Sequence, residues 1–245
     1  MRKVAIVAAL EREVSGLTRN WNRVERQYDG RRFVFLERGE VVVACGGIGL
    51  DAARRAAEAV IVLYHPTQLH SVGFAGALIP ELHVGDLIAA SVVIDARDGS
   101  RAFVAGADSQ NSLVTYMSVA GVQQKKNLAH AFGAKAVDME AAAVAAAAVA
   151  HGIPFAATKV ISDEWNFELP EMARFIDPQG RFKTANFALF AALRPWLWRR
   201  VALLAANSRK ATKALSEHLE LWVQDLSRAS EPVAATSGSH AEGGK

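Results

Sequence analysis

The sequence is poor in cysteine, and the apolar run at its N-terminus is short. Cys45 is the single cysteine among 245 residues, which excludes a disulfide within the chain and a cysteine-based metal site. The N-terminal run ends at Glu11, too early for a membrane span, and no signal peptide follows from it. We therefore expect a cytoplasmic protein without a bound metal ion.

A strong excess of one charge is also lacking. The formal net charge is +3 and the pI is about 9.1, a mildly basic balance that does not by itself indicate nucleic-acid binding. Hydrophobic residues make up 51% of the chain, which is enough for a sizeable buried core. We expect a folded protein with no nucleic-acid partner.

Short apolar runs alternate with helical stretches, which predicts an α/β fold with a mixed sheet flanked by helices. The expected strands are residues 3–8, 32–37, 40–45, 69–74, 86–94, 112–117, 134–138 and 155–161. The expected helices are residues 11–20, 50–64, 121–131, 140–151, 183–193 and 197–226. We interpret residues 1–228 as one domain with a C-terminal helix from about 194, and residues 229–245 as a disordered tail.

Two glycine-rich stretches follow expected strands. The turn GGIG, residues 46–49, leaves backbone N–H groups at a helix N-terminus, where Gly47 and Gly49 would suit an anion; a tight turn alone would also explain it. In SVGFAGAL, residues 71–78, the glycines allow a ligand or a neighbouring strand to come close. Each motif by itself is weak.

Four carboxylates stand at the ends of expected elements. Asp138 and Glu140 in VDMEAAAV begin a helix, where they either complement the helix dipole or accept hydrogen bonds from adjacent sugar hydroxyls. Asp163 ends a strand in VISD and is either an N-cap or a general acid. Glu13 lies in the first turn of a helix, a position that favours glutamate for structural reasons too.

The order of these motifs is more specific than any one of them. An N-terminal strand followed by AALEREV, then GGIG, VGFAGAL, VGD, VDMEAAAVA and IPFAATKVISD, resembles the nucleoside phosphorylase superfamily from about residue 2 to about 165. The most similar branch is that of the methylthioadenosine/S-adenosylhomocysteine nucleosidases. The resemblance implies a central twisted mixed sheet, a homodimer or larger assembly, no cofactor, and cleavage of the N-glycosidic bond of a purine nucleoside.

The resemblance also implies roles for particular residues. Glu140 matches the acid that holds the ribose hydroxyls, and Met139 packs beside the sugar. Asp163 matches the acid that serves the leaving purine, and Glu13 matches the base that activates water. Asp138 is then structural. Further expected substrate contacts in the same motifs are Phe74, Gly76 and Ser162, and the candidate anion ligands are Arg12, Gly47 and Gly49.

The chain departs from the family pattern in ways that bear on the nucleophile. The segment between VGD and VDME is shorter than usual, although it helps to shape the base pocket and the subunit contact in the family. Phe74 replaces a small hydroxyl residue, and Ser71 stands where many phosphorylases have a phosphate-binding arginine. Arg12 falls where phosphorylases of the superfamily often have another phosphate-binding arginine. We favour water as the nucleophile. In the alternative reaction, phosphorolysis, phosphate is the co-substrate.

The C-terminal part leaves two questions open. Trp165, Phe167 and Phe175 either line a pocket for a bulky 5′ substituent or pack a helix onto the sheet. Residues 194–216 contain six lysines or arginines, two tryptophans and no acid. This pattern favours a packed helix with a solvated basic face, and the alternative is a membrane-surface helix. A related branch of the superfamily removes adenine from an adenosyl-lipid in hopanoid biosynthesis.

The sequence therefore predicts a purine nucleosidase acting on adenosine derivatives such as methylthioadenosine or S-adenosylhomocysteine. The first alternative is a nucleoside phosphorylase, acting in one version on a lipid-linked adenosine. The second is a catalytically weak nucleoside-binding protein that keeps the fold.

Overall fold

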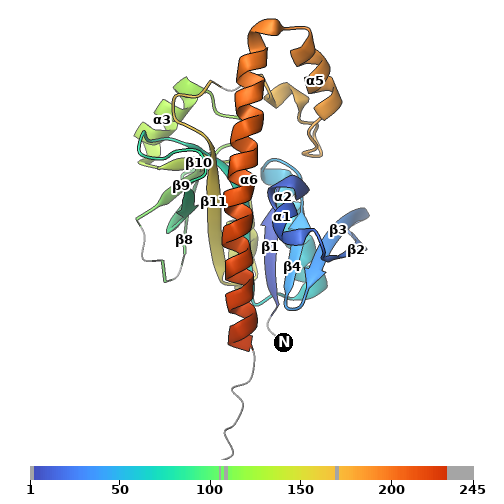
Figure 1. Ribbon diagram of the computed structural model, residues 1–245. Helices are drawn as coiled ribbons and strands as arrows, with labels where there is room; N and C mark the ends of the chain where they lie inside the picture. The colour runs from blue at the N-terminus through green and yellow to red at the C-terminus, as the bar shows by residue number, and fades with distance from the viewer. Residues whose placement is uncertain (1–2, 105, 108–109, 169–170, 231–245) are drawn as a thin grey trace, which may run out of the picture.

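The computed structural model describes residues 3–104, 106–107, 110–168 and 171–230. Within these residues, eleven strands form one mixed sheet that is covered by helices on both faces (Figure 1). The sheet order is β2-β3-β4-β1-β5-β10-β9-β7-β8, while β11 pairs with β5 and with β6. The strands are β1 Val4–Ala8, β2 Asn22–Tyr28, β3 Arg31–Arg38, β4 Val41–Cys45, β5 Gln68–Ala77, β6 Leu87–Ala89, β7 Val92–Asp95, β8 Arg101–Phe103, β9 Ser112–Thr115, β10 Ala136–Asp138 and β11 Phe155–Asp163.

The helices follow from local sequence as well as from packing. The α-helices are α1 Ser15–Thr18, α2 Leu50–Tyr64, α3 Val122–Phe132, α4 Ala141–Ala150, α5 Thr184–Ala192 and α6 Pro195–Ser230, with 3-10 turns η1 Glu11–Glu13 and η2 Ala173–Phe175. Alanine, the best helix former, makes up most of α4 and lets it approach α2 closely. Gly133, at φ +61°, ends α3 in the left-handed conformation.

The alternation of side chains along β1 explains the layers. Ala5 and Val7 face the cluster that includes α2 and α4, whereas Ile6 and Ala8 face the cluster that includes α6. All four side chains are buried, so this strand is apolar on both faces, as expected for a central strand with parallel neighbours.

β5 organises the sheet because it pairs with three strands. Along one edge it pairs with β11 from Leu69 to Gly76. Along the other edge its first part pairs with β1 in parallel and its last part pairs with β10 antiparallel. Since β1 and β10 run toward each other along this edge, the chain segments that follow them meet beside the middle of β5. Asp163, at the end of β11, lies next to Gly76 on the opposite edge.

The long helix α6 has two parts with different surroundings. Its second half packs on the sheet through Ala211, Leu215, Leu219 and Val223. Its first part extends beyond the sheet together with α5 (Figure 1). There a separate cluster forms around Phe175, Phe187 and Phe190, with Leu197 and Val201 packed against it. No helix of the described residues is long and apolar enough to cross a membrane.

The predicted α/β class with a mixed sheet is confirmed, and several boundaries are corrected. The structure adds β2 and β8 and divides the expected strand 86–94 into β6 and β7. The expected helix 11–20 is only the short turn η1 and the single-turn helix α1. Helix α6 continues to Ser230, two residues into the predicted tail, and residues 231–245 lie outside the described part of the chain.

Candidate active site

A cavity of about 490 Å³ lies at the carboxyl ends of the central strands. One wall comes from the residues that end or follow β1, β5, β10 and β11, including Glu13, Gly76, Glu140 and Asp163. The opposite wall comes from the C-terminal segment between Met172 and Arg209 and is largely apolar. The volume lies within the usual range of small-molecule sites, roughly 300–1,000 Å³.

Glu13 is held at the cavity by the turn that follows β1. Its side chain is 4% exposed, and its Oε2 accepts a hydrogen bond from the Leu10 N–H at 3.3 Å. Burial raises the pKa of the Glu13 carboxyl, and Lys159 and Arg12 oppose this rise. Gly73, at φ +140°, leaves the space that the carboxylate occupies, because a Cβ there would lie 2.9 Å from Glu13 Oε2.

Lys159 and Asp138 form a buried ion pair at the cavity, and Asp138 is one of the lining residues. Lys159 Nζ lies 2.9 Å from Asp138 Oδ2, and both side chains are at most 1% exposed. Asp138 also accepts hydrogen bonds from the Thr115 hydroxyl at 2.6 Å and from the Ala141 N–H at 2.8 Å, at the start of α4. Asp138, Glu140 and Glu13 together raise the pKa of Lys159 against the effect of burial. These contacts connect Asp138 to β9, β11 and the start of α4.

Glu140 precedes α4 and faces the cavity. Its Oε1 accepts a hydrogen bond from the Gly49 N–H at 2.8 Å, and its Oε2 accepts a longer one from the Met139 N–H at 3.3 Å. Burial and the nearby Asp138 carboxylate raise the pKa of Glu140 to about 8, although Lys159 and the Gly49 N–H oppose this rise. Each oxygen of this carboxyl group still has a free position for a hydrogen bond with a sugar hydroxyl.

Asp163 is fixed by its neighbour in sequence and by a lysine from α3. The Ser162 hydroxyl donates to Asp163 Oδ1 at 2.8 Å, and Lys125 Nζ pairs with Asp163 Oδ2. Lys125 also donates to the Glu164 carbonyl at 2.7 Å and is itself 1% exposed. Gly76 lies against this pair, since a Cβ there would be 2.9 Å from Asp163 Oδ2.

The glycine turn does not leave the free N–H groups that we expected for an anion. Gly46 and Gly47 donate to the carbonyls of Ala8 and Ala9, Ile48 donates to Gly180, and Gly49 donates to Glu140. Gly47 and Gly49 are therefore corrected from candidate anion ligands to structural residues. Gly49 instead orients the Glu140 carboxylate.

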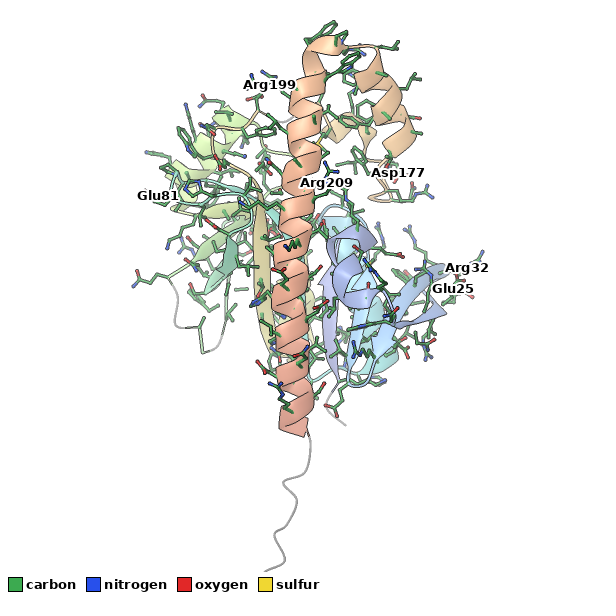
Figure 2. All side chains as sticks on the ribbon, in the orientation of Figure 1. Glu25, Arg32, Glu81, Asp177, Arg199 and Arg209 are labelled. Atoms are coloured by element: carbon green, nitrogen blue, oxygen red, sulfur yellow. The ribbon has the colours of Figure 1, made fainter. Side chains whose placement is uncertain are left out.

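The remaining predicted residues also fall at the cavity. Phe74, Gly76, Met139 and Ser162 line it, and so does the exposed Arg12. Ser71 does not, because its side chain is completely buried within β5. Arg209 of α6 also lines the cavity, and Figure 2 shows its position on this helix. Within the described residues, no group of three or more histidine, cysteine, aspartate or glutamate side chains is arranged to hold a metal ion.

The family model described as the phosphorylase superfamily matches residues 3–116 and 112–194. The chain belongs to the phosphorylase superfamily. This superfamily member is 35% identical over 96 residues to a 5′-methylthioadenosine/S-adenosylhomocysteine nucleosidase of Chromohalobacter salexigens, and 34% identical over 94 residues to that of Shewanella loihica. These alignments cover 38% and 37% of the chain and 41% of each relative, so the chain spans about two fifths of the curated relatives that it matches.

Solved structures share the fold of this superfamily member over most of its length. A mutant Helicobacter pylori 5′-methylthioadenosine/S-adenosylhomocysteine nucleosidase with 5′-methylthioadenosine in its active site has a TM-score of 0.64 at 19% identity. The alignment covers 90% of this chain and 99% of that one. Futalosine hydrolase of the same organism has a TM-score of 0.63 at 19% identity, with 90% and 98% covered.

The sequence alone did not indicate that Lys125, Lys159 and Arg209 belong to the candidate site of this superfamily member. A lysine inside the otherwise apolar strand FAATKVISD was a usable signal for Lys159, because a buried strand rarely carries an unpaired charge. Lys125 lies in a polar helix sequence and gives no such signal. Of the three aromatic residues considered for a 5′ substituent, Phe175 packs against Phe187 and Phe190, while Trp165 and Phe167 do not line the cavity.

Proposed function

We propose that the chain cleaves the N-glycosidic bond of a purine nucleoside, with water as the nucleophile. The observation that carries the proposal is that Glu13, Glu140 and Asp163, which come from three distant parts of the sequence, line one cavity of nucleoside size. The names of the curated relatives support the same chemistry.

In the proposed reaction, Glu13 takes a proton from the attacking water. The raised pKa of its buried carboxyl brings it nearer to neutral pH, where a general base is most effective. Water adds to C1′ of the ribose as the bond from C1′ to the purine nitrogen breaks. Glu140 forms hydrogen bonds with the ribose hydroxyls, and the ionised carboxylates around the site stabilise the positive charge that develops on the sugar.

The departing purine takes the bonding electron pair and needs a proton or a hydrogen bond. We assign this task to Asp163 together with Lys125. Lys125 Nζ has three N–H donors, of which Asp163 and the Glu164 carbonyl use two. One N–H therefore remains for the base beside the Asp163 carboxyl group. A positioned acid of this kind contributes roughly 10²–10⁴-fold in rate.

A second candidate is phosphorolysis, because the structure adds a cation that the sequence did not reveal. A phosphate dianion beside Glu13 needs positive charge nearby, and Arg12 alone is insufficient. Arg12 and Arg209 line the same cavity, which makes a phosphate site more plausible than the sequence indicated. The two candidates share Glu140 and Asp163 and differ in the nucleophile.

The deciding experiment is product analysis with the full-length protein. A panel of purine nucleosides is incubated with and without inorganic phosphate, and base release is measured together with the sugar product. We expect free ribosyl product at a rate independent of phosphate. If the product is a ribosyl 1-phosphate and its formation depends on phosphate, the reaction is phosphorolysis and not hydrolysis. If no nucleoside releases its base, both candidate reactions are rejected.

A further inference from the structure

We propose that the projecting end of the C-terminal helices docks on the surface of an anionic lipid membrane. The docking region, here called the α5–α6 tip, comprises residues 184–204: helix α5, the following turn and the first part of α6. Figure 1 shows this region beyond the edge of the sheet, at the end of α6 opposite to the end that packs on the sheet. The inference is independent of the reaction proposed above.

The tip concentrates exposed apolar side chains. Among the described residues, five of the eleven large hydrophobic side chains that are exposed lie in it: Leu189, Leu193, Trp196, Trp198 and Leu203. Trp196 and Leu193 are 73% and 69% exposed. The other six are spread over separate elements, where single exposed apolar residues are ordinary. The cluster at the tip therefore needs a separate explanation.

The outer face of α6 combines apolar and cationic side chains. Trp196, Arg200 and Leu203 are spaced by four and three residues, so they lie along one side of the helix. On a neighbouring side of α6, Leu197 and Val201 pack against the phenylalanine cluster. The outer face is thus not needed to hold the tip together, and its tryptophan-plus-arginine composition is typical of helices that lie at a membrane interface.

The charge of the tip favours an anionic surface. Residues 178–216 contain eight lysines or arginines and no acid. Arg199 and Arg200 are exposed, and neither has an ion-pair partner within the described part of the chain. Figure 2 shows Arg199 on this projecting part of α6. Free guanidinium groups next to exposed tryptophans can bind lipid phosphates while the rings enter the headgroup region.

The same charge disfavours a second copy of the chain as the occupant. A symmetric contact between two tips would place both sets of arginines against each other, with no acid in residues 178–216 to compensate. The tip also projects from the body, and a projecting apolar surface suits a fluid lipid layer that adapts to its shape. These observations favour the membrane over self-association.

Vesicle co-sedimentation with the full-length protein tests the proposal. The vesicles are phosphatidylcholine alone, or phosphatidylcholine with 30% phosphatidylglycerol. We expect binding to the anionic vesicles, little binding to the neutral ones, and a decrease on raising the salt concentration. Replacing both Arg199 and Arg200 by Gln should weaken binding at least tenfold, since each basic residue near such a surface contributes about fivefold.

Matched controls separate a specific tip from general charge and hydrophobicity. The double variant Arg31→Gln/Arg32→Gln also removes two adjacent exposed arginines, but from β3. Leu193→Ser is paired with Leu221→Ser, whose side chains are 69% and 63% exposed. The tip variants should lose binding and the controls should keep it. All four should keep their circular dichroism spectrum and their base release from soluble nucleosides.

Three results would overturn the proposal. One is the absence of binding to anionic vesicles at low salt. Another is an equal loss of binding in the tip variants and their controls, which would indicate non-specific attraction. The third is a lipid-free dimer, detected by sedimentation velocity, that the tip variants convert to monomer, because the tip would then be an interface between two copies.

Discussion

At the residue scale, the candidate site is a set of buried charges that partly cancel. Three carboxylates, Glu13, Asp138 and Glu140, surround the single ammonium group of Lys159. Such an arrangement is costly for folding, because every charge is removed from water. Glu140 illustrates the cost, since its pKa of about 8 means that the folded protein favours its neutral form.

This raised pKa predicts a pH-dependent stability. Between about pH 5 and pH 8 the folded protein keeps a proton on Glu140 that the unfolded chain has released, so stability falls as the pH rises through this window. The variant Glu140→Gln cannot ionise. We expect its Tm to match that of the wild type near pH 5 and to exceed it by several degrees at pH 9, measured by thermal melts across the range. A Tm difference that does not change with pH would contradict the assigned pKa.

The role of Asp163 as the acid is tested with a single and a double variant. Asp163→Asn should lower kcat for base release at least a hundredfold, because the amide cannot supply a carboxylic proton. It also leaves the buried Lys125 without its partner, which costs stability. The double variant Asp163→Asn/Lys125→Met should recover much of that stability and none of the activity. A near wild-type kcat in either variant would exclude this role.

The sequence located the acidic residues but not the cations that pair with them. The acids stand at the ends of elements within specific motifs, so their positions followed from the pattern. The partner lysines come from β11 and α3, and their ion pairs exist only after these elements pack. A lysine in a polar helix such as α3 is usually exposed, and nothing local distinguishes Lys125 from the neighbouring Lys126.

At the element scale, α6 serves as a cover for the sheet in its second half. Leu215 is completely buried, whereas Leu221, on the same helix, is 63% exposed. We expect Leu215→Ala to lower the free energy of unfolding by about 2–5 kcal/mol, because it opens a cavity against the sheet. Leu221→Ala should change it by less than about 0.5 kcal/mol. Urea unfolding followed by circular dichroism measures both. Equal effects would show that α6 does not pack as described.

The strands that the sequence missed have a common cause. β2 reads NRVERQY, and none of its residues is fully buried, so it has no apolar pattern to detect. It forms because β3 offers its free edge and pairs with it over seven residues. β8 is likewise a short edge strand held by β7. Central strands were predictable because burial dictates their composition, whereas edge strands depend on a neighbour.

At the scale of the whole molecule, the cavity lies between the sheet and an apolar wall from the C-terminal segment. The sequence did not place that wall, because Phe182, Phe187, Val201 and Leu204 reach the cavity only through tertiary packing. If the 5′ group of the nucleoside contacts this apolar wall, nucleosides with longer 5′-alkyl groups should bind better.

A series of 5′-alkylthioadenosines tests this arrangement. Each additional buried methylene contributes about 0.8 kcal/mol, so kcat/KM should rise roughly fourfold per carbon until the cavity is filled. Val201→Ser should flatten the series while leaving the smallest member nearly unaffected. A kcat/KM that falls from the first added carbon would place the 5′ group elsewhere.

The pairing of β5 with β1, β10 and β11 has a consequence for the order of folding. The partners of β5 come from widely separated parts of the chain, so no hairpin or local unit contains the candidate site. Long loops must close before Glu13, Glu140 and Asp163 come together, and such closures are slow compared with helix formation. During synthesis, too, Asp163 emerges after the other strands that flank β5. The cavity is therefore among the last features to form, and recovery of ligand binding marks the completion of the fold.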